Sequence, residues 1–211
     1  MGSSEFRIFR TRTNITDIIQ FEFLHINFIG AISIVELELI IGTVPSRPWV
    51  RLCAMASPTI CYWFGIVFVG SSILTLMGKK LPFNMSSTPK GSTWRPALLA
   101  LIEDAGGVEA SGGVIYRANV MKRYEVSPVF RRMILYLTFA WGVVLLGVAI
   151  TSTVLIACLN EDVGFGLGWG LPYVVSTIAV FLTMAFVKSQ LRREKRLWQT
   201  KREAVGQNNE I

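Results

Sequence analysis

Hydrophobic residues along this chain gather in four long blocks, separated by polar segments. The blocks cover residues 26–44, 52–77, 133–159 and 165–187. Each block is long enough to cross the roughly 30 Å of hydrocarbon in a bilayer, which takes about 20 helical residues. The last two blocks contain no charged residue. The pattern predicts an all-α integral membrane protein, a bundle of four transmembrane helices.

Prolines predict where two of these helices end or bend. Pro45 and Pro48 follow the first block and should stop its helix, because proline lacks the backbone N–H that a helix needs. Pro58 lies inside the second block, and the apolar run continues on both sides of it. We therefore expect a kink at Pro58 rather than an end.

The polar segment between the second and third blocks is expected to contain two short helices. Residues 94–102 are apolar enough for a helix that lies on the membrane or on the bundle. Ser92 or Thr93 would cap it, and Pro96 suits an early helical position. Residues 116–124 form the second candidate helix.

The distribution of Lys and Arg predicts the orientation in the membrane. Three of them precede the first block, nine lie between the second and third, and seven follow the fourth, whereas the first connection has two and the third has none. Basic residues accumulate on the cytosolic side, so both termini and the central loop are expected there. The predicted divisions are a cytosolic N-terminal segment (1–25), transmembrane helices 1 and 2 (26–77), a cytosolic loop (78–132), transmembrane helices 3 and 4 (133–187) and a basic cytosolic tail (188–211).

Composition supports a membrane protein and offers little for catalysis. The chain is 52% hydrophobic and 17% charged, whereas soluble domains carry about 25% charged residues. Its three cysteines all lie in apolar blocks without metal-ligand spacing, and His25 is its one histidine, too few for a multi-histidine metal or haem site. No P-loop, dinucleotide fingerprint or catalytic motif is present. We predict no catalytic residue, metal or cofactor from these patterns.

Glu36 and Glu38 are the most unusual residues, because they lie within the first apolar block. A charged residue at the centre of a membrane helix costs about 2.5 to 3.5 kcal/mol on insertion. Two residues that are two positions apart on a helix point in directions that differ by about 200°, so the two carboxyls should not share one partner. They fit a proton- or ion-coupled site or an acid of a membrane enzyme. The alternative is a protonated packing contact, or a helix that lies shallowly in the membrane.

Two adjacent acids in the central loop form a second candidate site. Glu103 and Asp104 precede Gly106 and Gly107, and clustered carboxylates hold hard cations or face phosphate-bearing partners. The alternative is the end of an ordinary surface helix.

The segment after the fourth block is strongly basic. Such a cluster just inside a membrane helix attracts the anionic cytosolic leaflet, or serves only as a topology anchor. No nucleic-acid fold accompanies the charge, so no nucleic-acid partner is expected. The lipid-facing basic residues that we single out are Lys188, Arg192, Arg193, Lys195 and Arg196.

Small residues in the third block predict close helix packing. Ala149, Thr153 and Ala157 recur every four residues, with Gly147 and Thr151 beside them, and small side chains let helix backbones approach. Packing against the fourth helix is favoured, and a homodimer contact is the alternative.

Three stretches of the chain resemble a family of fungal multi-pass membrane proteins. They read NMSSTPKG, RPALLALIEDAGGVEASGG and RYEVSPVFRRM, and the resemblance extends from about Trp49 to Trp198. The residues that carry it are Arg95 to Leu98, Glu103, Asp104, Gly112, Gly113 and Arg123 to Arg131. The resemblance implies a multi-pass architecture and a fungal source, and it implies no catalytic residues.

Three functions remain open from the sequence. The favoured one is a non-enzymatic accessory or scaffold protein that presents its cytosolic loop and tail to a protein partner. The second is a small proton-coupled transporter that acts as a homo-oligomer. The third is a small membrane enzyme acting on a lipophilic metabolite, for which the four acids Glu36, Glu38, Glu103 and Asp104 are the candidates.

Overall fold

A computed structural model describes residues 23–84, 88–106 and 113–208 of the chain, and all of its named elements are helices. Four of them are long and apolar enough to cross a membrane. The prediction of an all-α multi-pass membrane protein is confirmed at this level. The predicted N-terminal segment up to residue 22 and the turn at Gly112 lie outside the described residues. The helices are α1 (Phe23–Thr43), α2 (Val50–Ala54), α3 (Ala56–Leu76), α4 (Ala97–Asp104), α5 (Gly113–Val126), α6 (Pro128–Cys158) and α7 (Glu161–Asn208).

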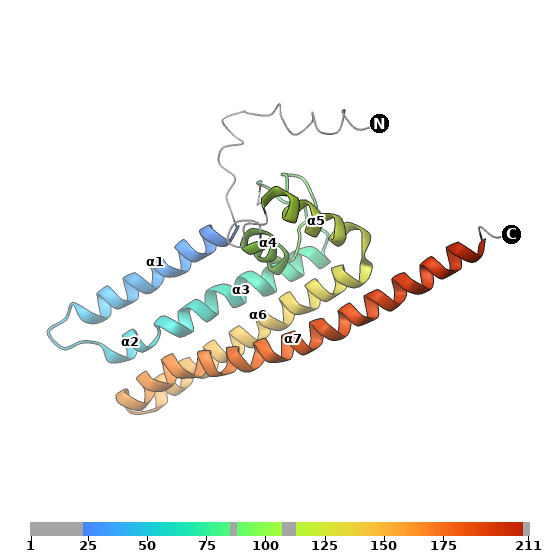
Figure 1. The fold of residues 1–211 in the computed structure, drawn as a ribbon. Helices are drawn as coiled ribbons and strands as arrows, with labels where there is room; N and C mark the ends of the chain where they lie inside the picture. The colour runs from blue at the N-terminus through green and yellow to red at the C-terminus, as the bar shows by residue number, and fades with distance from the viewer. Residues whose placement is uncertain (1–22, 85–87, 107–112, 209–211) are drawn as a thin grey trace.

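The long helices α3, α6 and α7 pack on one another, and α1 adds to one side of this group through α3. α3 packs on both α1 and α6, and α6 packs on α7 (Figure 1). α1 lies at the edge of this group, and most of its apolar side chains are exposed. α4 and α5 lie across one end, against α1, α3 and α6. We call α4 and α5 the α4–α5 layer and call this end the basic end.

Glycines allow α3 and α6 to approach closely. A methyl group placed on Gly65 of α3 would lie 2.8 Å from the side chain of Leu146, and one placed on Gly142 of α6 would lie 2.7 Å from the side chain of Val69. Because the two helices are antiparallel, each glycine receives the larger residue that stands one turn from the other glycine. This reciprocal fit places the most extensive helix contact of the molecule between α3 and α6.

Two of the small residues of the third apolar block contact α3, which we did not expect. Ala149 is fully buried and packs with Cys61 of α3, and Thr153 lies 3.2 Å from the hydroxyl of Tyr62, also of α3. Val175 of α7 packs on the same cluster as Ala149, so this part of the third block contacts α3 as well as the fourth membrane helix. Gly147 and Ala157 are exposed.

Pro58 separates two helices instead of bending one. The ring of a proline clashes with the carbonyl four residues earlier, and its nitrogen cannot donate to that carbonyl. For Pro58 this carbonyl belongs to Ala54, where α2 ends. Helix α3 then starts at Ala56 and places Pro58 in its first turn. The predicted kink was wrong because an early helical position suits proline.

The first short helix of the loop begins without the caps that we expected. Pro96 is its N-cap residue, and the proline side chain accepts no hydrogen bond from the first turn of the helix. The hydroxyl of Ser71, on α3, accepts a hydrogen bond of 3.1 Å from the backbone N–H of Ala97 instead. Neither Ser92 nor Thr93 caps the helix. The contact joins the α4–α5 layer to the end of α3.

Both C-terminal membrane helices extend past their apolar blocks. α6 starts at Pro128, where Ser127 accepts a hydrogen bond from the backbone N–H of Phe130 as an N-cap. α7 has 48 residues, about 70 Å of helix, and continues through the basic tail. The predicted division at residue 187 is therefore not a structural boundary, because one helix contains both parts (Figure 1).

Candidate functional site

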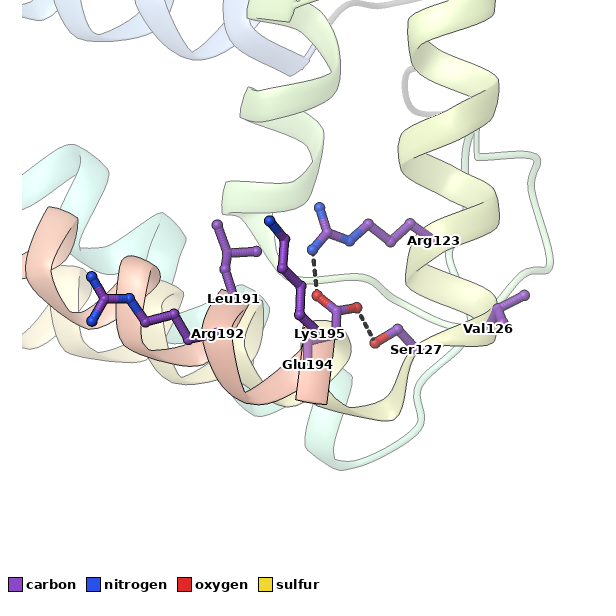
Figure 2. Close-up of a pocket in the computed structure, with 7 residues that line it drawn as sticks. All are labelled: Arg123, Val126, Ser127, Leu191, Arg192, Glu194 and Lys195. Carbon is purple, nitrogen blue, oxygen red and sulfur yellow. Dashed lines mark hydrogen bonds and ion pairs between the residues drawn. The ribbon is translucent and has the colours of Figure 1, made fainter. Parts of the chain in front are cut away.

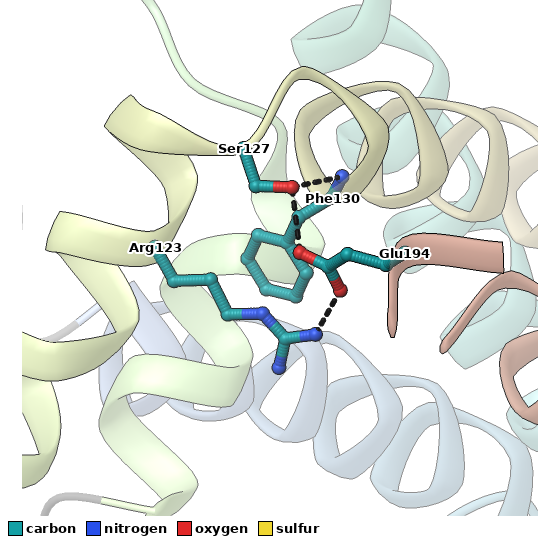
Figure 3. Close-up of polar contacts among 4 residues, drawn as sticks. All are labelled: Arg123, Ser127, Phe130 and Glu194. Carbon is teal, nitrogen blue, oxygen red and sulfur yellow. Dashed lines mark hydrogen bonds and ion pairs between the residues drawn. The ribbon is translucent and has the colours of Figure 1, made fainter. Parts of the chain in front are cut away.

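A carboxylate of α7 joins the helix to the α4–α5 layer at the basic end. Glu194 accepts a short hydrogen bond from the guanidinium of Arg123 on α5, and another of 2.6 Å from the hydroxyl of Ser127 (Figure 3). Only 8% of the surface of Glu194 is exposed. The carboxylate therefore receives a charge-assisted donor at one oxygen and a neutral donor at the other, as a buried carboxylate requires.

The same three residues also fix the start of α6. The Ser127 hydroxyl donates to Glu194 while it accepts from the backbone N–H of Phe130. The guanidinium of Arg123 lies 4.5 Å from the centre of the Phe130 ring, within reach of a cation–π interaction. One turn of α6, the end of α5 and the tail of α7 are thus held by one group of side chains, the Arg123–Ser127–Glu194 cluster.

Arg95 holds the two helices of the layer together. Its guanidinium lies 5.8 Å from the ring centre of Tyr124, and it forms an ion pair of 3.5 Å with the exposed carboxylate of Glu125. Burial raises the pKa of the Tyr124 phenol, and Arg95 and Arg131 lower it by a smaller amount. The phenol is therefore neutral at physiological pH, and its ring packs in the core of this end.

Glu103 and Asp104 are buried, each with 1% of its surface exposed. Asp104 accepts a hydrogen bond of 3.2 Å from the backbone N–H of Leu24 in the first turn of α1, and lies 3.8 Å from the guanidinium of Arg117 on α5. A carboxylate near a helix N-terminus is stabilised by the exposed N–H groups there. The alternative of a surface helix end was wrong, because both acids are buried and Asp104 joins α1 to the α4–α5 layer.

The two membrane acids lie on different faces of α1, as their spacing predicts. Glu38 faces α3, where one carboxylate oxygen accepts a hydrogen bond of 2.7 Å from the hydroxyl of Thr59. Its other oxygen is buried and accepts no hydrogen bond from the described residues. Glu36 is exposed on the outer face. Glu38 and Leu24 are separated by about 20 Å along α1, so the membrane acids and the loop acids form two sites.

A pocket of about 510 Å³ lies beside the Arg123–Ser127–Glu194 cluster. Figure 2 shows Leu191, Arg192 and Lys195 on α7, opposite Arg123 and Val126 at the end of α5. Its lining is mostly apolar carbon, with cationic groups at the rim. Of the five basic tail residues singled out from the sequence, two contribute to this pocket.

The remaining basic tail residues take no part in the pocket. Lys188, Arg193 and Arg196 are exposed and do not line it; Lys188 lies on the same face of α7 as Arg192 and Lys195, nearer the apolar block, and Arg193 lies on the opposite face. Glu194 was missed by sequence reasoning, although it is the one acid within the basic run KSQLRREKR. An acid that interrupts a basic segment on a helix was the available signal.

The opposite end of the molecule has a separate cation contact. Arg51 of α2 donates hydrogen bonds to the carbonyl oxygens of Ala157, at 2.7 Å, and Leu159, at 3.3 Å. These are among the last carbonyls of α6, and a cation there interacts favourably with the helix dipole. Arg51, one of the two basic residues of the first connection, thus stabilises the C-terminal end of α6.

Within the described residues, no group of three or more His, Cys, Asp or Glu side chains could hold a metal ion. The contacts at the basic end bind helices to one another, and the pocket beside them has both charged and apolar residues in its lining.

One family, described as a domain of unknown function (DUF8766), matches residues 6–198. No match was found among curated proteins or among solved structures.

Proposed function

The chain belongs to the DUF8766 family, and from this premise we propose that it is a non-enzymatic membrane scaffold whose α4–α5 layer and basic helix face the cytosol. The membrane helices anchor these parts, and the basic half of α7 presents cations to a protein partner with an acidic surface. The fungal source and the cellular membrane belong to this proposal only as expectations.

The observation that carries the proposal is the attachment of α7 to the α4–α5 layer. Helix α7 continues without interruption from its membrane span into the basic segment. Glu194 then binds Arg123 and Ser127, so the segment leaves the membrane in a fixed direction. A tail that served only as a topology anchor would need the charges, but not this attachment.

The cytosolic orientation is supported by the position of the charges. The start of α1, the α4–α5 layer and the tail of α7 share one end of the molecule (Figure 1). The positive-inside rule assigns that end to the cytosol. Cysteine accessibility tests it directly on a chain in which Cys53, Cys61 and Cys158 are replaced by Ser. In this background Gln199→Cys should react with a membrane-impermeant maleimide only in opened cells, and Asp162→Cys should react in intact ones.

The scaffold role is tested with a photo-cross-linking residue placed at Gln199, near the end of the basic helix, and at Asp162 as the matched position at the other end. We expect a defined cross-link to a cytosolic protein from Gln199 only. Arg123→Gln, which loosens the attachment, should reduce its yield. A cross-link pattern that is the same from both positions would contradict the proposal.

A second candidate, a proton-coupled membrane function, is favoured by one observation. Glu38 keeps a carboxylate oxygen buried without a hydrogen-bond partner among the described residues, and intramembrane acids commonly mark proton paths. Glu38→Gln should then abolish a pH-dependent flux, or change the metabolite profile of cells if the acid belongs to an enzyme. Under the scaffold proposal Glu38→Gln changes neither, and Glu36→Gln serves as control.

A further inference from the structure

We infer that the pocket between α5 and α7 binds the headgroup of one anionic phospholipid of the surrounding bilayer. The inference extends the proposed function, because it names a ligand for the basic end of the scaffold. It rests on the height of the pocket, its charge and its lining.

The pocket begins at the outer part of the lipid headgroup layer. The apolar block of α7 ends at Val187, and the pocket residues Leu191 to Lys195 follow four to eight positions later. At 1.5 Å per residue they lie about 6 to 12 Å beyond the end of the apolar block. Each headgroup layer occupies roughly the first 5 to 7 Å beyond the hydrocarbon. The near side of the pocket therefore meets the outer part of this layer, and a lipid headgroup of the same bilayer reaches it without the lipid leaving the membrane.

The charge of the pocket favours an anion. The carboxylate of Glu194 is matched by the guanidinium of Arg123, with which it forms an ion pair. Arg192 and Lys195 also line the pocket and add two positive charges to it, and both side chains are exposed. Lys and Arg bind phosphate oxygens strongly, and Arg does so with two parallel donors.

The apolar part of the lining favours a lipid over a free anion. Val126 stands at the end of α5 with 56% of its surface exposed, and Leu191 lies on α7; both line the pocket. The carbon atoms of a lipid headgroup would cover these side chains. The volume of about 510 Å³ lies within the usual range for small-molecule sites.

The test uses the purified full chain, with phosphatidylserine and with phosphatidylcholine of the same acyl chains, and native mass spectrometry to measure the lipid-bound fraction. We expect one phosphatidylserine to bind in preference to phosphatidylcholine. Arg192→Gln with Lys195→Gln should lower the affinity for phosphatidylserine about 25-fold, about fivefold for each charge removed. Arg193→Gln with Arg196→Gln removes the same charge from α7 outside the pocket and should change the affinity less than threefold.

Two results would overturn the inference. Equal losses in both double variants would indicate diffuse attraction to the whole helix, and equal binding of the two lipids would exclude an anionic headgroup site. Unchanged melting temperatures would show that each variant is folded. We expect this result because the substituted side chains are exposed. The measurement requires neither a protein partner nor a known orientation, so its outcome is independent of the cross-linking test of the scaffold.

Discussion

A methyl group placed on Gly168 would lie 2.7 Å from the carbonyl oxygen of Ala54. Each of these two residues stands four positions before a proline. Pro58 cannot donate to the Ala54 carbonyl, and Pro172, inside α7, cannot donate to the carbonyl of Gly168. The interruption between α2 and α3 therefore packs directly on the backbone of α7, and only glycine fits there.

Gly168→Ala should lower the free energy of unfolding by about 1 to 3 kcal/mol, because the methyl group meets backbone that cannot rotate away. Gly166→Ala is the matched control, since nothing lies within 4 Å of its added methyl group. That control should be neutral or more stable by up to about 1 kcal/mol. Thermal unfolding in detergent measures both, and an equal effect of the two would contradict the packing described.

Asp104→Ala should lower the free energy of unfolding by about 2 to 3 kcal/mol, because it removes a buried carboxylate that accepts a hydrogen bond from Leu24 and pairs with Arg117. Asp104→Asn keeps an acceptor and should cost less. Glu125→Ala removes a carboxylate that is 67% exposed from its pair with Arg95, so it should cost less than about 1 kcal/mol. Chemical denaturation followed by tryptophan fluorescence distinguishes the three.

Ser127→Ala should cost about 0.5 to 2 kcal/mol, as expected for the loss of an N-cap. Glu194→Ala also removes the bond between these two residues. The double variant should therefore cost about 1 kcal/mol less than the sum of the single ones, since both remove the same interaction. The cycle compares the free energies of unfolding of the unaltered chain, the two single variants and the double variant. Strict additivity would show that the hydroxyl and the carboxylate act independently.

Thr59→Val should destabilise the chain by about 1 to 3 kcal/mol, because the Thr59 hydroxyl donates to Glu38, and without it neither oxygen of this carboxylate has a hydrogen-bond donor among the described residues. On a Glu38→Leu background the same substitution should cost almost nothing. Glu36→Leu is the control background, since that acid is exposed and faces away. There Thr59→Val should keep its full cost. Thermal unfolding provides the comparison, and a cost that does not depend on Glu38 would exclude the pair as its cause.

The membrane spans and short helices could be predicted because they depend on local pattern. An apolar block of membrane length must form internal hydrogen bonds in lipid, so composition alone identifies the helix. The α4 and α5 helices were also expected, within a few residues of their ends. The continuation of α7 could have been predicted, because the tail consists largely of good helix formers and contains no proline.

The contacts between distant residues could not be predicted. Asp104 meets Leu24, which is 80 positions away, and Glu194 meets Ser127, which is 67 positions away. Periodicity along one helix gives no information on which partner lies across from it. The burial of Glu103 and Asp104 follows from the way the loop folds back on α1 and α3, and this depends on the whole arrangement.

Because α7 is one continuous helix, a change in the tilt of its membrane span also moves its basic segment. About 30 Å of helix extends beyond Val187, so a tilt of about 10° in the membrane span would displace the far end by about 5 Å. Helices tilt when the hydrocarbon around them becomes thinner. Changes in bilayer thickness would thus be converted into a movement of positive charge, with Glu194 as the point where the α4–α5 layer restrains it.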